Sequence, residues 1–174
     1  DNDLIFISGG ETSYDIFLII SLSKNKIIYN KIMPTKKAYH RSILIKNNLY
    51  IIGGQDQNKK VSQECNIFNT EENRWHFFPN LKKGRKNPSL CLYNETILYV
   101  FNGEDDTDVL DTIEYIDINN LNNKKGWNII KPIDYGFVWH GMKNSLVINI
   151  DKDKILICGG ENKENILYKD CFLF

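Results

Sequence analysis

The sequence predicts an all-β protein built from repeats, and three observations indicate this class. Four short apolar runs each end in glycine, at residues 4–10, 49–54, 98–103 and 155–160. Successive runs close 44, 49 and 57 residues apart, at Gly10, Gly54, Gly103 and Gly160. No amphipathic segment of helical length occurs between the runs. A repeat of about 50 residues made only of strands predicts a succession of small sheets.

Glycine at the end of these runs has a physical role. The third run closes with Asn102 and Gly103, and the other three close with pairs: Gly9 and Gly10, Gly53 and Gly54, Gly159 and Gly160. Glycine permits a positive φ, and the missing Cβ lets a neighbouring chain approach closely. The runs are apolar at successive positions rather than alternating, which is typical of strands covered on both faces. We therefore expect sheets that stack against one another.

The second repeat shows the expected strands most clearly. Its four apolar segments are residues 42–45, 49–52, 64–68 and 75–78. Turn-forming residues at 46–48 and 69–73 indicate two hairpins between them. Equivalent segments along the chain predict three strands in the first repeat, four in each of the next two and three in the last.

Aromatic residues and the segments before each first strand also recur. Phe68 on the third segment precedes Trp75 on the fourth, as Tyr115 precedes Trp127. In the first repeat this tryptophan position falls near Ile27, with Tyr29 beside it. The recurring segments before the first strands read Lys-Ala-Tyr-His at 37–40, Arg-Lys-Asn-Pro at 85–88 and Phe-Val-Trp-His at 137–140.

Together these features resemble the kelch repeat over essentially the whole chain. The resemblance implies a kelch-type β-propeller of about three and a half four-stranded blades, in which the large aromatic residues fill the wedges between blades. It places one domain over residues 1–174, with repeats at about 1–36, 37–81, 82–133 and 134–174. Because His40 and His140 recur at equivalent positions, we expect them to be framework residues rather than ligands or catalysts.

An arc of this size leaves apolar faces and strand edges uncovered, and closed propellers have about 4–8 blades. We expect the remaining blades in the same longer polypeptide, outside these residues. Two alternatives stay open. A second copy of the chain completes the ring, or a short strand from elsewhere closes a ring of four blades.

Composition excludes some partners. The 22 basic and 22 acidic residues give a net charge of zero, which argues against nucleic acid or an anionic membrane as the main partner. No run approaches the ~20 apolar residues of a membrane helix, and no leader peptide is visible. None of the four cysteines forms a Cys-x-x-Cys pair, so we interpret Cys65, Cys91, Cys158 and Cys171 as free thiols of a reducing compartment, which predicts a cytoplasmic location.

Two groups of residues are candidate contacts for a protein partner. The first is the acidic loop at 104–111, with Glu104, Asp105, Asp106 and Asp108, together with Arg85 from the basic run at 82–86. A basic patch on a partner is the preferred ligand of the loop; Ca²⁺ or simple solvation is the alternative. The second group is Tyr135 and Trp139, which serve as aromatic anchors for a peptide or pack against a neighbouring blade.

Catalysis finds no support in the sequence. None of the common nucleophile, zinc-protease, P-loop or dinucleotide motifs is present. His40, His76 and His140 lack carboxylates at useful spacing. We therefore expect no enzyme activity, no cofactor and no metal site.

Kelch domains serve as protein-interaction modules, so the resemblance implies that role here. Within the family the domain presents substrates to ubiquitin ligases, and this adaptor role is the first expectation. The alternatives are a structural component of the cytoskeleton or of cilia, and an accessory propeller of an enzyme such as a kelch-linked phosphatase.

Overall fold

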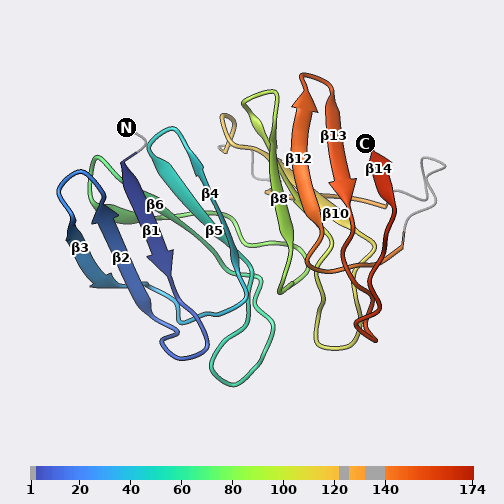
Figure 1. The fold of residues 1–174 in the computed structure, drawn as a ribbon, viewed down its shortest axis with the longest axis horizontal. Coiled ribbons are helices and arrows are strands. Elements are labelled where there is room, and N and C mark those ends of the chain that lie inside the picture. Colours follow the sequence, from blue (N-terminus) through green and yellow to red (C-terminus); the bar gives the residue numbers. More distant parts are fainter. Residues whose placement is uncertain (1–2, 122–125, 132–139) are drawn as a thin grey trace.

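The computed structural model describes residues 3–121, 126–131 and 140–174 and confirms the all-β class. Its strands form four separate antiparallel sheets, each a meander in chain order, which we call blades one to four (Figure 1). Blade one contains β1 (Leu4–Ser8), β2 (Ile16–Ser21) and β3 (Lys26–Ile32). Blade two contains β4 (Arg41–Ile45), β5 (Asn48–Ile52), β6 (Cys65–Asn69) and β7 (Arg74–Phe77). Blade three contains β8 (Ser89–Tyr93), β9 (Ile97–Phe101), β10 (Ile113–Asp117) and β11 (Asn128–Ile130). Blade four contains β12 (Leu146–Asp151), β13 (Lys154–Cys158) and β14 (Cys171–Leu173).

The distribution of strands over the blades agrees with the sequence-based prediction of three, four, four and three. A glycine pair follows β1 as it follows β5, so β1 is the equivalent of a second strand. Among the described residues, blade one therefore lacks a first strand, and blade four lacks a fourth. No helix in the described part of the chain has the length and apolar character needed to cross a membrane.

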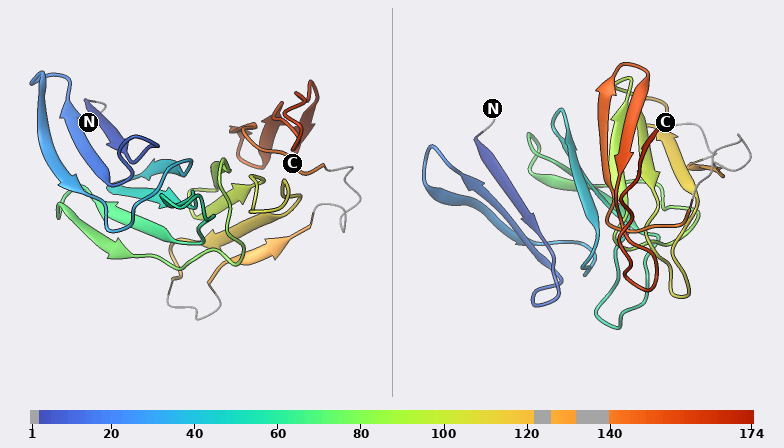
Figure 2. Two further views of the ribbon diagram at one scale, coloured as in Figure 1. Left: turned by 90° about the horizontal axis from the view of Figure 1, so that it is seen from below. Right: turned by 45° about the vertical axis from the view of Figure 1, so that its right-hand side comes forward.

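The blades form an open arc, as the view from below in Figure 2 shows. β8 lies beside both β4 and β12, which places the first strands of blades two, three and four together. Blades one and four lie at the two ends of the arc.

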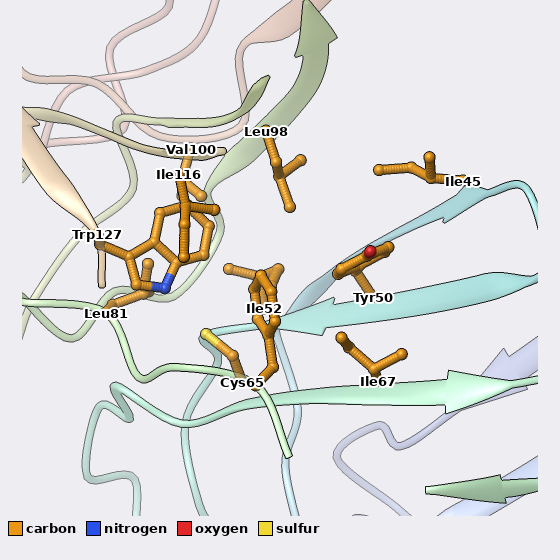
Figure 3. Close-up of a cluster of buried hydrophobic side chains, with 11 residues drawn as sticks. Ile45, Tyr50, Ile52, Cys65, Ile67, Leu81, Leu98, Val100, Ile116 and Trp127 are labelled. Carbon is orange, nitrogen blue, oxygen red and sulfur yellow. The ribbon is translucent and has the colours of Figure 1, made fainter. Parts of the chain in front are cut away.

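Apolar side chains fill each space between adjacent blades. Between blades two and three, Trp127 is 1% exposed and its ring centroid lies 5.7 Å from that of Phe78. Figure 3 shows the facing residues of this cluster: Ile45, Tyr50, Ile52, Cys65 and Ile67 from blade two, and Leu98, Val100, Ile116 and Trp127 from blade three. This packing confirms that a tryptophan fills the wedge between blades.

The cluster between blades one and two shows how the tryptophan position and its neighbours are placed. Trp75 packs against Phe17, with ring centroids 4.8 Å apart. In blade one Ile27 takes the equivalent place, because it pairs with Ile20 and Ile20 with Ile5, as Trp75 pairs with Phe68 and Phe68 with Leu49. Tyr29 lies on the opposite face, 5.0 Å from the ring of Phe68. Ile27 is 53% exposed. The pairing of β2 with β3 shifts register between Ile19 and Ile20, so Tyr29 pairs with Ile19 and faces blade two.

The glycine-terminated strands are covered on both faces only inside the arc. In β5 all residues from Leu49 to Ile52 are buried. In β1, Ile5 and Ile7 are 43% and 40% exposed. The expectation of two covered faces therefore holds for a strand between two blades and fails at the end of the arc.

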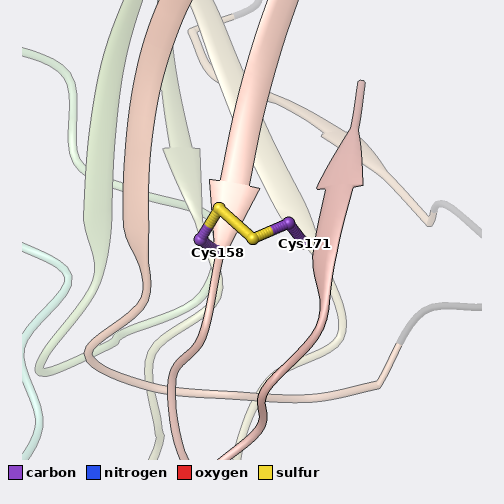
Figure 4. The surroundings of a disulfide bond; sticks show 2 residues. All are labelled: Cys158 and Cys171. Carbon is purple, nitrogen blue, oxygen red and sulfur yellow. A yellow bond between two sulfur atoms is a disulfide. The ribbon is translucent and has the colours of Figure 1, made fainter.

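The cysteines divide into two kinds, which corrects the expectation of four free thiols. Cys65 and Cys91 are free and buried. Cys158 and Cys171 form a disulfide between β13 and β14 (Figure 4). These two residues are direct partners in the strand pairing, with Cα atoms 4.2 Å apart. Because β-pairing brings them opposite each other, their separation in the sequence gives no sign of the bond.

Candidate functional site

The long loops gather along one side of the arc, where they connect the same ends of the strands in every blade. Strands alternate in direction, so loops from second to third strands lie at the same end as the connections between blades. They form the lower edge of the molecule in Figure 1. The four loops are residues 9–15, 53–64, 102–112 and 159–170. We call this end the loop face.

Three of these loops are anchored in the same way. In blade two, Gln55 bridges Ala38 of the preceding connection and Val61 on the far side of its own loop. The same pair of bridges recurs in blades three and four, at Lys86, Glu104 and Val109 and at Lys143, Glu161 and Leu167. The loop face is therefore a repeated, hydrogen-bonded surface rather than a set of independent loops.

In each of these loops, the residue that follows the bridging residue (Gln55, Glu104 or Glu161) stabilises the turn with its side chain. Asp56 Oδ1 accepts hydrogen bonds from the backbone N–H groups of Asn58 and Lys60. Asp105 Oδ1 and Asn162 Oδ1 do the same for their own loops. Asp and Asn side chains commonly stabilise turns by accepting hydrogen bonds from backbone N–H groups a few residues further along the chain. Asp105 therefore has a structural role that the sequence-based assignment to partner binding did not include.

Lysines neutralise much of the acidic loop. Lys83 Nζ lies 2.9 Å from Asp105 Oδ2, and Lys143 Nζ lies 3.1 Å from Glu104 Oε2. Lys163 Nζ lies 3.4 Å from Asp108 Oδ2. Partial burial by itself raises the pKa of Asp105, but the hydrogen bonds from Lys83 and from its own loop outweigh burial and hold that pKa well below its ordinary value.

Asp106 links the acidic loop to the neighbouring blade by a hydrogen bond. Its Oδ1 accepts a hydrogen bond of 3.1 Å from the backbone N–H of Val61 in the blade-two loop. The acidic loop thus joins blades two, three and four through its own side chains. Within the described residues, no group of three His, Cys, Asp or Glu side chains is placed to hold a metal ion.

Arg85 is buried and therefore cannot contact a partner directly. Its side chain is fully buried, and its guanidinium donates hydrogen bonds to the carbonyl oxygens of Asn102 and Thr112. It also forms an ion pair with Glu114, with 2.8 Å between Nη2 and Oε1. The placement in an exposed basic run was wrong because Arg85 turns inward between blades two and three while Lys83 and Lys86 beside it reach carboxylates of the loop face.

Sequence reasoning missed Glu114, the partner of Arg85. Glu114 is 0% exposed and accepts hydrogen bonds from the backbone N–H groups of Lys82 and Lys83. The one signal is a carboxylate in the second position of β10, between Ile113 and Tyr115. In blade two the equivalent basic residue is Lys37, whose Nζ donates to the carbonyl oxygen of Glu64.

A groove of about 690 Å³ lies between the loops of blades two and three. Asp56 and residues 60–64 line it on the blade-two side, and Asp105, Asp106 and Thr107 line it on the blade-three side. Its charged lining includes Lys36, Lys60 and Lys83 as well as these aspartates and Glu64. A smaller hollow of about 290 Å³ lies beside it, between Glu11, Tyr39, Gln55, Lys59 and Glu104.

The remaining candidates fall in different places. Tyr135 and Trp139 lie outside the described residues, so their proposed role stays a prediction. His140 stacks on Tyr168, with ring centroids 6.1 Å apart. His76 Nε2 lies 2.8 Å from Glu72 Oε2 on the outer strand of blade two, a carboxylate contact that sequence reasoning did not find.

His40 lies between blades one and two, with its Nε2 2.8 Å from Ser8 Oγ. Its Nδ1 is buried and has no hydrogen-bond partner among the described residues. Burial lowers the pKa of His40 to about 4, and the nearby positive charges of Lys37 and Arg41 act in the same direction. This neutral, enclosed ring is a packing residue of the blade interface.

We expect His40 to make the fold sensitive to mild acid. In the unfolded chain its pKa returns to about 6.5, so between pH 6.5 and 4 the unfolded state binds a proton that the folded state does not. The free energy of unfolding should fall across this range by up to about 3 kcal/mol. Urea unfolding of the wild type and of His40→Gln at several pH values measures the difference, and parallel curves would contradict it.

One comparison with known families gives a match. Residues 36–82 match the family model described as Kelch motif, and these residues contain all four strands of blade two. A search of curated proteins found no match. The same strand order and the same glycine-terminated second strands recur in the other blades. The match shows a kelch motif in residues 36–82, and the four antiparallel sheets agree with blades of a kelch-type β-propeller.

Proposed function

We propose that the chain is a protein-interaction module that binds its partner through the groove on the loop face. The observation that carries this proposal is the groove of about 690 Å³ built by loops of two neighbouring blades. Small-molecule sites are mostly apolar and enclosed. This groove is open and lined by lysines, aspartates and polar loop residues, which suits a segment of polypeptide carrying both charges.

The rigidity of the loop face supports the same proposal. Bridges and turn hydrogen bonds hold the loops on both sides of the groove in place. A preformed surface binds with a smaller loss of conformational entropy than a set of mobile loops. Kelch repeats in general serve as interaction modules, which supports binding over catalysis.

The finer role we propose is that of a substrate adaptor for a ubiquitin ligase in the cytoplasm. A structural role in the cytoskeleton or in cilia, or as the accessory propeller of an enzyme, is the alternative. Co-purification of the tagged protein from its native cells separates these roles. Recovery of a cullin or its adaptors supports the ligase role, whereas tubulin or actin without ligase components contradicts it.

A matched pair of variants tests the groove. Lys60→Glu with Asp106→Lys reverses two charges that line it and leaves the net charge unchanged. Lys152→Glu with Asp153→Lys makes the same exchange in the exposed β12–β13 hairpin at the opposite end. We expect the groove variant to lose about tenfold or more of each specific partner and the hairpin variant to keep it. Equal recovery with both variants would contradict binding at the groove.

A further inference from the structure

Each blade has two faces that are used differently. We call the face toward the next blade along the chain the forward face, and the face toward the preceding blade the rear face. Three forward–rear contacts hold the arc together. No described residue covers the rear face of blade one or the forward face of blade four.

The rear face of blade one is an aliphatic surface. Ile5 pairs with Ile20, which pairs with Ile27, and Ile7 pairs with Leu18, so these five side chains share one face. Ile5, Ile7 and Ile27 are 43%, 40% and 53% exposed.

The same positions are buried wherever a neighbouring blade is present. In blade two, the equivalents of Ile5 and Ile7 are Leu49 and Ile51, which are 3% and 0% exposed. Both pack in the cluster against blade one. The exposure in blade one therefore follows from a missing neighbour and not from a different kind of residue.

The forward face of blade four shows the complementary situation. Ile148 pairs with Leu156, and Leu156 pairs with Leu173, which places the three on one face. Ile148 and Leu173 are 42% and 52% exposed. The equivalent of Leu173 in blade two is Ile67, which is 6% exposed in the cluster against blade three.

We propose that these two faces bind each other, so that the forward face of blade four packs on the rear face of blade one in a second copy of the chain. The contact continues the forward–rear packing that the chain already uses between its own blades. Each copy carries one face of each kind at the two ends of the arc (Figure 2). Two copies joined head to tail leave neither face exposed.

The missing first strand of blade one narrows this contact but does not prevent it. On the rear faces of blades three and four the first strands do contribute, with Leu90 and Leu92 of β8 and Val147 of β12. In the cluster between blades one and two, the rear face of blade two contributes residues of β5, β6 and β7: Leu49, Ile51, Phe68 and Trp75. Its first strand, β4, adds none to that cluster among the described residues. The equivalents of β5, β6 and β7 are β1, β2 and β3, and all three are present in blade one. A net charge of zero adds no overall repulsion between copies.

Paired variants test the assembly by sedimentation. Ile5→Lys with Ile7→Lys blocks the rear face, and Ile148→Lys with Leu173→Lys blocks the forward face. Phe77→Lys is the matched control, because Phe77 is 85% exposed on the outer strand of blade two. Circular dichroism checks that each variant is folded.

We expect the wild type and Phe77→Lys to sediment at twice the 20.3 kDa of one chain. Each double variant alone should associate about 100-fold more weakly or worse, because lysine opposes burial of the face. An equimolar mixture of the two double variants should again form two-chain particles, because each supplies the face that the other lacks. Only head-to-tail packing predicts that the mixture forms two-chain particles when neither double variant does so alone.

Three results would overturn the proposal. If the wild type sediments as a single chain at all concentrations, the two faces do not bind each other, and blades of a longer polypeptide become their expected partners. Association that survives both double variants would place the contact elsewhere. Failure of the mixture to associate would contradict head-to-tail packing.

Discussion

Replacing Glu114 with alanine should destabilise the fold by about 3–5 kcal/mol, because it leaves a buried cation without its partner. Arg85 and Glu114 are both 0% exposed, and the ion pair joins them at 2.8 Å. The substitution also removes the acceptor for the backbone N–H groups of Lys82 and Lys83. Burial lowers the pKa of Arg85, whereas the Glu114 carboxylate acts to raise it, so the loss of that carboxylate exposes the full cost of burial.

Urea unfolding measures this loss, with two further variants as controls. Glu71→Ala removes a carboxylate from an exposed turn and should change the stability by less than about 0.5 kcal/mol. Arg85→Met combined with Glu114→Met removes both charges and should cost less than Glu114→Ala alone. A loss below about 1 kcal/mol for Glu114→Ala would contradict the role assigned to the pair.

Gly53→Ala is the second substitution with a large expected effect, of about 3 kcal/mol or more. Gly53 has a φ of 66°, which costs an alanine about 1–2 kcal/mol. A Cβ at this position would also overlap the backbone carbonyl oxygen of Arg85 in the connection to blade three. Backbone cannot move aside as a flexible side chain does, so the two blades must separate, which adds about 1–3 kcal/mol.

Gly159→Ala is the matched control. Its φ of 64° is nearly the same, but the nearest described atom to its Cβ is the carbonyl oxygen of Tyr168 at 3.7 Å. This variant should therefore lose only the 1–2 kcal/mol or so that the left-handed backbone costs. Thermal or urea unfolding of both variants separates conformational strain from the close approach of blades. Equal losses would contradict a special role for blade contact at Gly53.

Local patterns predicted most of the fold. Glycine-terminated apolar runs and turn residues depend on neighbours in the sequence, so they located the strands of blade two to within one or two residues. The aromatic positions Trp75 and Trp127 were also predictable, because strand period and hairpin length bring them to the wedge between blades. Asn102 in place of a glycine fits the same pattern, since it adopts a φ of 55°.

The sequence was least informative where the outcome depended on pairing between strands. A register shift near Ile19 decides that Tyr29 faces blade two, while Ile27 keeps the tryptophan position on the opposite face, because a slip of one residue exchanges the faces of a strand. Strand pairing also joined Cys158 to Cys171. Neither event leaves a mark on the residues adjacent in the sequence.

The candidate site was only partly predictable for the same reason. The sequence identified the acidic loop but not the lysines that neutralise it, since Lys143 and Lys163 come from blade four. It grouped Arg85 with exposed lysines, although the guanidinium turns inward to Glu114. The groove between blades two and three exists only once two loops from different repeats lie side by side.

The sequence by itself therefore determined the repeat, the strands and the family resemblance, because periodicity and turn chemistry act over a few residues. Tertiary structure decided which charges are buried, which cysteines meet and which apolar faces remain open. Those properties depend on contacts between residues 13 to 55 positions apart or between whole blades. Only the pairing of strands and the packing of one blade on the next bring such residues within reach.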